Sequence, residues 1–111
     1  MAAKFELKLT AKKKWMFNLK AGNGEIILTS EPYAARESAA NGIESLRENS
    51  AEVASFDVRT AKNGEQYFVL QAANKEIIGK SEMYKSPASV KRGIASVMRN
   101  APSARVVEIK A

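Results

Sequence analysis

Apolar and polar side chains alternate along the first thirty residues. Residues 5–10 read FELKLT, the same period of two recurs over residues 15–21, and residues 25–30 are rich in β-branched side chains. A period of two places the apolar side chains on one face of a strand. Gly22-Asn23-Gly24 is typical of a hairpin turn, because asparagine and glycine tolerate a positive φ. The pattern therefore predicts three strands joined by tight turns, with left-handed backbone at Asn23.

The whole pattern recurs 51 residues later. Over residues 5–50, 16 of the 46 residues are identical to the residue 51 positions further on, without a gap. Residues 104–110 continue this register as a third copy of the opening strand. We therefore predict one domain over residues 1–111, with a first repeat over about 4–51, a second over about 55–102 and a closing strand over about 104–110.

A helix is predicted after the third strand of each repeat. In the second repeat Ser86 is placed as the N-cap and Pro87 as the first helical residue. The equivalent cap position in the first repeat holds Ala35, so that helix is expected to begin less firmly. Gly42 and Gly93 recur in the middle of the two apolar helix faces, which indicates a close approach between each helix and the sheet.

The order of elements is three strands and a helix, twice, followed by one strand. Hairpin connections make the strands mainly antiparallel, and two helices can cover only one face of such a sheet. The predicted class is therefore α+β, with both helices on one face. Since the closing strand copies the first strand of a repeat, we expect it to pair as the first strand of the second repeat does, so that each repeat is completed by a strand following its own helix.

The repeated residues carry a resemblance to a known family. The pattern F-x-L-K-A-x-N-G-E-x-I, then S-E-x-Y, then G-I-x-S and N runs from Phe17 to Asn49 and recurs, slightly degraded, from Phe68 to Asn100. It resembles the YegP-like family of small bacterial proteins and covers nearly the whole chain. The chain departs from the family pattern at Ala35, where serine is usual, and at Lys75, where glycine is usual.

The resemblance implies a fold more than an activity. Members carry β(3)-α-β repeats that share one sheet, with the C-terminal strands exchanged between repeats. A chain with two repeats resembles a covalently fused dimer, so a monomer is expected. The resemblance brings no established activity, cofactor or catalytic residue with it.

Composition removes several kinds of chemistry. The 111 residues include no cysteine and no histidine, which excludes disulfides, thiolate nucleophiles, histidine-based zinc sites and Ser-His-Asp triads. The repeated acids Glu25 and Glu76 follow turns, and Glu31 and Glu82 lie just before the helices, where carboxylates are usually structural. We therefore expect no enzyme activity, no metal and no cofactor. No apolar run has the length of a signal peptide or membrane span, so we expect a cytoplasmic protein without a membrane contact.

Charge provides the remaining lead. The net charge is +6, of which residues 1–54 contribute +1 and residues 55–111 contribute +5. The predicted binding residues combine a lysine-rich turn, cations at the second helix and one tyrosine on the uncovered sheet face: Lys12, Lys13, Lys14, Tyr67, Lys85, Lys91 and Arg92. Met16 and Val69 are expected beside Tyr67 on that open face.

Two functions remain open for these residues, and no partner can be named from the sequence. The favoured hypothesis is a non-catalytic protein-interaction or structural module. The alternative is nucleic-acid binding through the second helix, the lysine-rich turn or the open sheet face.

Overall fold

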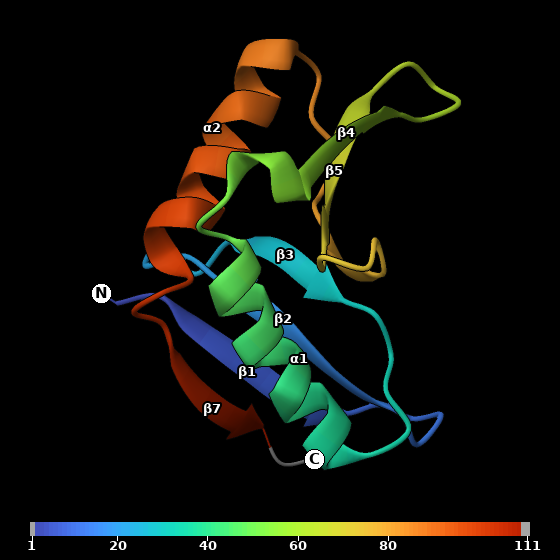
Figure 1. The fold of residues 1–111 in the computed structure, drawn as a ribbon, viewed down its shortest axis with the longest axis vertical. Helices are drawn as coiled ribbons and strands as arrows, with labels where there is room; N and C mark the ends of the chain where they lie inside the picture. The colour runs from blue at the N-terminus through green and yellow to red at the C-terminus, as the bar shows by residue number, and fades with distance from the viewer. Residues whose placement is uncertain (1, 110–111) are drawn as a thin grey trace.

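A computed structural model, which describes residues 2–109, shows one sheet with two helices on one of its faces (Figure 1). The strands are β1 (Lys4–Leu9), β2 (Trp15–Lys20), β3 (Ile26–Ser30), β4 (Phe56–Thr60), β5 (Gln66–Gln71), β6 (Ile77–Lys80) and β7 (Arg105–Ile109). The helices are α1 (Arg36–Asn49), α2 (Pro87–Asn100) and a short 3-10 turn, η1 (Val53–Ser55). The α+β class and the repeat of three strands and a helix are as the sequence predicts.

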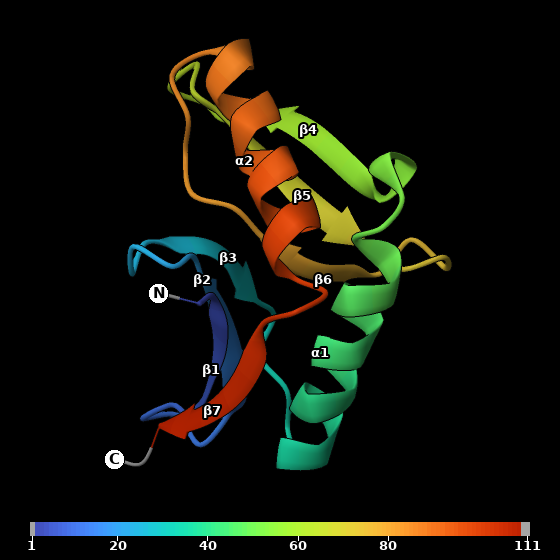
Figure 2. The same cartoon turned by 90° about the vertical axis from the view of Figure 1, so that its left-hand side faces the viewer.

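Six strands of the sheet are arranged symmetrically about its centre. The strand order is β4-β5-β6-β3-β2-β1-β7, so each repeat contributes three adjacent strands and β7 is added beside β1. The halves meet where β3 and β6 pair antiparallel, through Thr29 opposite Lys80 and Ser30 opposite Gly79. The strands of the two halves run in different directions in Figure 2. Six of the seven strands thus form two copies of one three-stranded unit.

The closing strand crosses to the other repeat. β7 follows α2 but pairs with β1 of the first repeat, in parallel, from Lys4 opposite Arg105 to Lys8 opposite Ile109. The exchange implied by the family resemblance is therefore confirmed. The expectation that β7 would pair as β4 does is wrong, because β4 forms an antiparallel hairpin with β5. No later strand within the described residues can form such a hairpin with β7, and Figure 2 shows α2 leading directly to the edge of β1.

Each helix packs on the sheet through a glycine and a tyrosine. The ring of Tyr33 stacks on Phe17, with the centroids 6.4 Å apart, and lies under α1. A Cβ atom on Gly42 would lie 2.8 Å from Cζ of that tyrosine. Tyr84 and Gly93 repeat the arrangement under α2, at 2.7 Å. The mid-helix glycines are therefore required by packing, and what approaches them is the tyrosine ring.

The helix starts differ as the cap residues predict. The Ser86 hydroxyl accepts a hydrogen bond from the Ser89 N–H at 3.1 Å and caps α2. Ala35 offers no such bond to α1, although its backbone is extended in the same way.

The prediction of left-handed backbone at Asn23 is wrong. Positive φ falls at Gly24 and Lys75, one residue after the two asparagines that were expected to adopt it. Instead, Oδ1 of Asn23 and of Asn74 accepts a hydrogen bond from the N–H two residues on, at 3.0 Å in both cases. The asparagines therefore shape the turn through their side chains.

Neither helix within residues 2–109 is long and apolar enough to cross a lipid bilayer.

Candidate functional site

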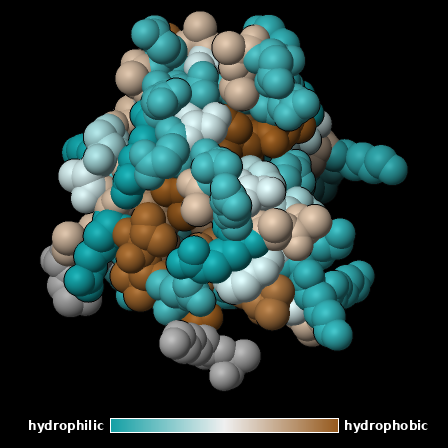
Figure 3. All heavy atoms as spheres, turned by 60° about the horizontal axis from the view of Figure 1, so that its bottom comes forward, coloured by the Kyte–Doolittle hydropathy of each residue, from teal (hydrophilic) through white to brown (hydrophobic). Residues whose placement is uncertain are grey.

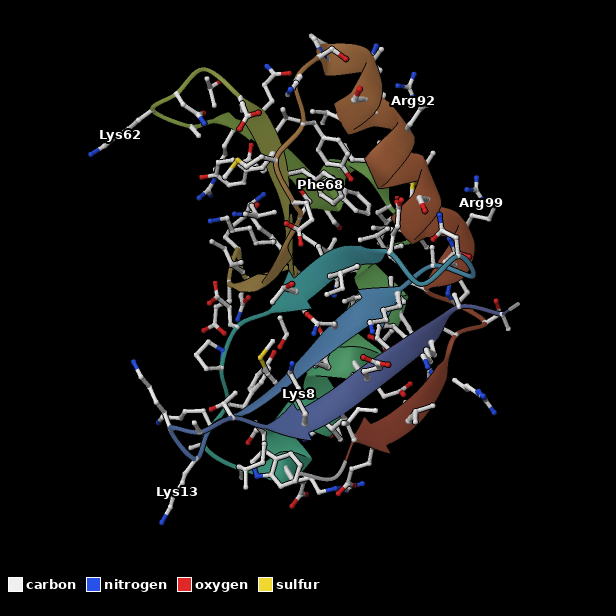
Figure 4. All side chains as sticks on the ribbon, turned by 180° about the vertical axis from the view of Figure 1, so that it is seen from behind. Lys8, Lys13, Lys62, Phe68, Arg92 and Arg99 are labelled. Atoms are coloured by element: carbon white, nitrogen blue, oxygen red, sulfur yellow. The ribbon has the colours of Figure 1, made fainter. Side chains whose placement is uncertain are left out.

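The basic residues singled out from the sequence lie in separate places. Lys12, Lys13 and Lys14 are exposed in the turn between β1 and β2, at one end of the first repeat. Lys91 and Arg92 are exposed on α2, and Lys85 is exposed just before it. Figure 4 shows Lys13 and Arg92 at opposite ends of the molecule. The structure therefore offers a local cluster at α2 and does not join it to the lysine-rich turn.

Tyr67 lies on the opposite face of the sheet from α2. Its side chain is half-buried, and Nζ of Lys80 lies 5.0 Å from the centroid of its ring. The chain's own cation thus covers one face of the ring that stacking on a base would need. Tyr67 and the α2 cations cannot form one surface, because the sheet separates them.

The open sheet face is less open than the alternation of residues predicts. Val69 does point away from the helices, but it is buried, as is Asn18, its counterpart 51 positions earlier. Val69 lies opposite Lys80, whose side chain reaches Tyr67 across the face. Asn18 accepts a hydrogen bond from Oγ1 of Thr29 at 2.9 Å. The side chains of the central strands therefore fill the middle of this face.

Charges on the open face are also largely paired. Nζ of Lys20 lies 2.9 Å from Oε1 of Glu6, and Nζ of Lys4 lies 3.3 Å from Oε2. The hydrogen bond from Lys20 lowers the pKa of Glu6. Arg59 binds Asp57 at 2.9 Å on the second repeat. These pairs reduce the positive field that a polyanion would meet on this face.

The repeated serines and tyrosines are engaged within the fold, and two of the repeated acids lie beside a hollow. Glu31 and Glu82 border a hollow of about 290 Å³ at the junction of the two repeats. Beside them, the Ser30 and Ser81 hydroxyls each accept a strand N–H and donate to a main-chain carbonyl, so both are satisfied. Burial raises the pKa of Tyr84 beneath its helix. Within residues 2–109 no group of three or more acidic, histidine or cysteine side chains could hold a metal ion.

An apolar groove, which the sequence analysis missed, lies between α2 and η1. Its volume is about 310 Å³, and we call it the second-repeat groove. It is lined by Val53, Lys91, Ile94, Ala95 and Met98. Figure 3 shows one face of the molecule, on which apolar side chains gather in separate patches among hydrophilic ones. Val53 is 66% exposed, a large value for an aliphatic side chain beside a groove.

The edge strand beside this groove also exposes apolar surface. Val58 lies opposite the buried Phe68, hence on the helix face of the sheet, yet it is 45% exposed. Its counterpart in the first repeat, Leu7, is 1% exposed. Ile94 in the groove is half-buried, whereas its counterpart Ile43 is 1% exposed. The same surface is therefore covered in the first repeat and uncovered in the second.

In the first repeat, β7 and the segment leading to it lie beside this apolar surface. Nη2 of Arg47 on α1 donates a hydrogen bond to the carbonyl of Ala104. Arg36 forms an ion pair with Glu108 of β7 at 2.7 Å. Nothing within the described residues takes this place on β4, which forms the opposite edge of the sheet.

These features define a class of protein that consists of two fused repeats, each of three strands and a helix. An exchanged strand is added to the outer edge of one repeat only. The family described as a domain of unknown function, DUF1508, matches the chain twice, over residues 11–57 and 61–108. The chain therefore belongs to this family, whose members include the YegP proteins.

Relatives and solved structures match this chain over 94–97% of its length. A UPF0339 protein of Pseudomonas aeruginosa is 50% identical over 104 residues, covering 94% of each chain. YegP of Escherichia coli K12 is 49% identical over 106 residues, covering 96% of each. The solution NMR structure of E. coli YegP, a protein of unknown function, superposes with a TM-score of 0.92 at 48% identity, covering 97% of this chain and 93% of that one. A UPF0339 protein of Shewanella oneidensis gives 0.90 at 45%, covering 97% and 92%.

Proposed function

We propose that this protein is a monomeric, non-catalytic module that binds another protein through the second-repeat groove and the adjoining edge of β4. The observation that carries the proposal is the difference between the two repeats. Leu7 of β1, which has β7 beside it, is 1% exposed, whereas its counterpart Val58 on the unpaired edge of β4 is 45% exposed. Apolar surface beside an unpaired strand edge is typical of a protein-binding site.

The non-catalytic part of the proposal is supported by the side chains that the chain holds. Neither histidine nor cysteine occurs in the sequence, and the repeated serines, tyrosines and glycines are engaged in packing or hydrogen bonds. The exposed groups that remain are mostly lysines, arginines and glutamates on separate elements. Glu31 and Glu82 do border one hollow, but both are exposed and occupy equivalent positions, whereas acid–base catalysis needs two groups in different environments.

Site-directed photo-cross-linking in the source cells tests the proposal. A photoreactive residue at Ala95, inside the groove, should give a discrete adduct with one protein. The same residue at Glu44, the counterpart of Ala95 on α1, is the matched control and should give none. The proposal fails if Ala95 gives no adduct, or if both positions give the same adducts.

Polyanion binding by α2 is the alternative that a specific observation supports. Lys91 and Arg92 are exposed on a helix that carries no acidic residue, and Lys85 lies just before it. If short RNA or DNA binds there, the affinity should fall steeply between low and moderate salt, because bound counterions are released. NMR titration at two salt concentrations checks this, and absence of any shift in α2 at low salt would reject it.

A further inference from the structure

One segment of this chain corresponds to two different strands of a repeat. The two family matches end at residues 57 and 108, which lie in β4 and β7 and are separated by the repeat length of 51. β4 is therefore the equivalent of β7, as the strand after a helix, and also of β1, as the strand that opens a repeat. It pairs with β5 as an opening strand. Because β4 already occupies the place of an opening strand, it cannot also be the strand added beside that place. The outer edge of β4 therefore has no neighbouring strand within the described residues.

The first repeat shows what adds to such an edge. β7 lies parallel to β1, with Val106 opposite Phe5 and Glu108 opposite Leu7 on the helix face. The symmetry-related place on the second repeat is the outer edge of β4, where Phe56 and Val58 take the positions of Phe5 and Leu7. A parallel strand there would cover the side chains that remain exposed.

The side chains around this edge differ from those that hold β7. Arg36, which binds Glu108, is replaced at the equivalent position by Pro87, and Arg47, which binds the Ala104 carbonyl, is replaced by Met98. Glu108 is an exposed residue, so a carboxylate at its position beside β4 would stay hydrated but would lose its arginine partner and would add no apolar contact beside Val58. A second copy's β7 therefore fits poorly, and an apolar side chain fits better at that position.

The positive charge of α2 also indicates which kind of segment would bind. Lys91 lines the groove where the first repeat has Ala40, and α2 also carries Arg92 and Arg99 without an acid. An acidic stretch next to the added strand would be attracted to this helix.

We infer that the outer edge of β4 binds an extended segment of another protein as a parallel strand, with apolar residues facing α2 and acidic residues flanking them. This inference rests on the proposed function, since it names the partner chemistry of the same surface. Main-chain hydrogen bonds to β4 would supply affinity, and the groove would select the side chains.

A peptide with two glutamates followed by residues 103–109, carrying Glu108→Val, is the probe. Titrated into the isotope-labelled full chain, it should shift the amides of residues 53–60 and 91–98 but not those of β1. A spin label at its N-terminus should broaden Phe56 more than Thr60, because the added strand is parallel. The matched peptide that keeps Glu108 should bind up to about fivefold more weakly, because its exposed carboxylate has no arginine partner at β4.

Two variants with similar exposure serve as controls in the protein. Val58→Lys should abolish the shifts, whereas Leu9→Lys, at a position 46% exposed on β1, should leave them unchanged.

Each contrary result overturns a defined part of the inference. Broadening at Thr60 instead of Phe56 excludes the parallel orientation. Equal binding of both peptides, or dimerisation of the chain through β4, assigns the edge to a second copy. Shifts confined to α2, or no shifts, exclude strand addition, and cross-linking from Ala95 then decides separately whether the groove binds a protein.

Discussion

At the scale of single residues, the two repeats place different amino acids at the same left-handed turn positions. The turn between the first two strands has a positive φ at Lys13 and at its counterpart Gly64, and the next turn has one at Gly24 and at its counterpart Lys75. A Cβ atom on either glycine would meet nothing within 4 Å. The preference for glycine at these positions therefore comes from the backbone alone.

Replacing either lysine by glycine should stabilise the protein. Left-handed backbone costs a residue with a Cβ about 1–2 kcal/mol, and the extra freedom of glycine in the unfolded chain costs about 0.5–1 kcal/mol. Lys13→Gly and Lys75→Gly should each raise the free energy of unfolding by about 0.5–1 kcal/mol in urea titrations. Gly24→Lys and Gly64→Lys should lower it by a similar amount, and equal stability of all four variants would contradict this account.

Alanine at the mid-helix glycines should have the opposite effect from the usual one. In an open helix Gly→Ala stabilises by about 1 kcal/mol. At Gly93 the new methyl group would press on Tyr84, whose ring is fixed by stacking on Phe68 at 6.2 Å. Overpacking of this kind costs about 1–3 kcal/mol, so Gly93→Ala should be destabilising in net terms.

The clash at Gly93 can be separated from a general helix effect by a double mutant. Tyr84→Phe removes the hydroxyl but keeps the ring, so it should partly relieve Gly93→Ala in a double-mutant cycle followed by thermal unfolding. Gly42→Ala should behave alike in the first repeat. A gain in stability from either alanine would show that the tyrosine moves aside without cost.

At the scale of elements, the local signals in the sequence were sufficient for most of the structure. Alternation, turn residues and caps predicted the hairpins and both helices, because each depends on neighbours within a few residues. The pairing of β7 was not predictable in this way, since Val106 meets Phe5 only after the chain has folded. Family resemblance supplied that pairing, whereas extrapolation from the copied strand gave the wrong one.

The cap residues at the two helix starts can be exchanged between the repeats by mutation. Ala35 and Ser86 have nearly the same backbone angles, with φ of −129° and −144° and ψ of 150° and 155°. A serine hydroxyl at position 35 should therefore reach the N–H of Ser38. Ala35→Ser should raise the free energy of unfolding by about 1 kcal/mol, and Ser86→Ala should lower it similarly. Hydrogen exchange at the first turn of each helix checks whether the change is local.

At the scale of the whole molecule, the candidate site shows the limit of residue-by-residue reasoning. Lysines and arginines can be counted from the sequence, but their distribution over two ends and two faces depends on the fold. The second-repeat groove was missed because exposure of Val58 or Ile94 reflects a strand that does not lie beside them. Its signal was present in the comparison of the repeats, where Arg36 and Arg47 correspond to Pro87 and Met98.

The unequal ends of the sheet should be visible in amide exchange. β1 has a neighbouring strand on both sides, whereas β4 is an edge. In the full chain, amides that β1 directs to β2 should therefore exchange more slowly than the equivalent amides that β4 directs to β5.

Removing residues 104–111 should make the two ends alike. The loss of β7 exposes Phe5 and Leu7 and deletes the ion pair with Arg36, so protection of β1 should fall to the level of β4 while β5 and β6 change little. Glu108→Gln, which removes only the ion pair, should have a much smaller effect. If β1 and β4 were equally protected in the full chain, or β1 were indifferent to the truncation, β7 would not be the strand that closes the first repeat, and the second repeat would have no corresponding place to fill.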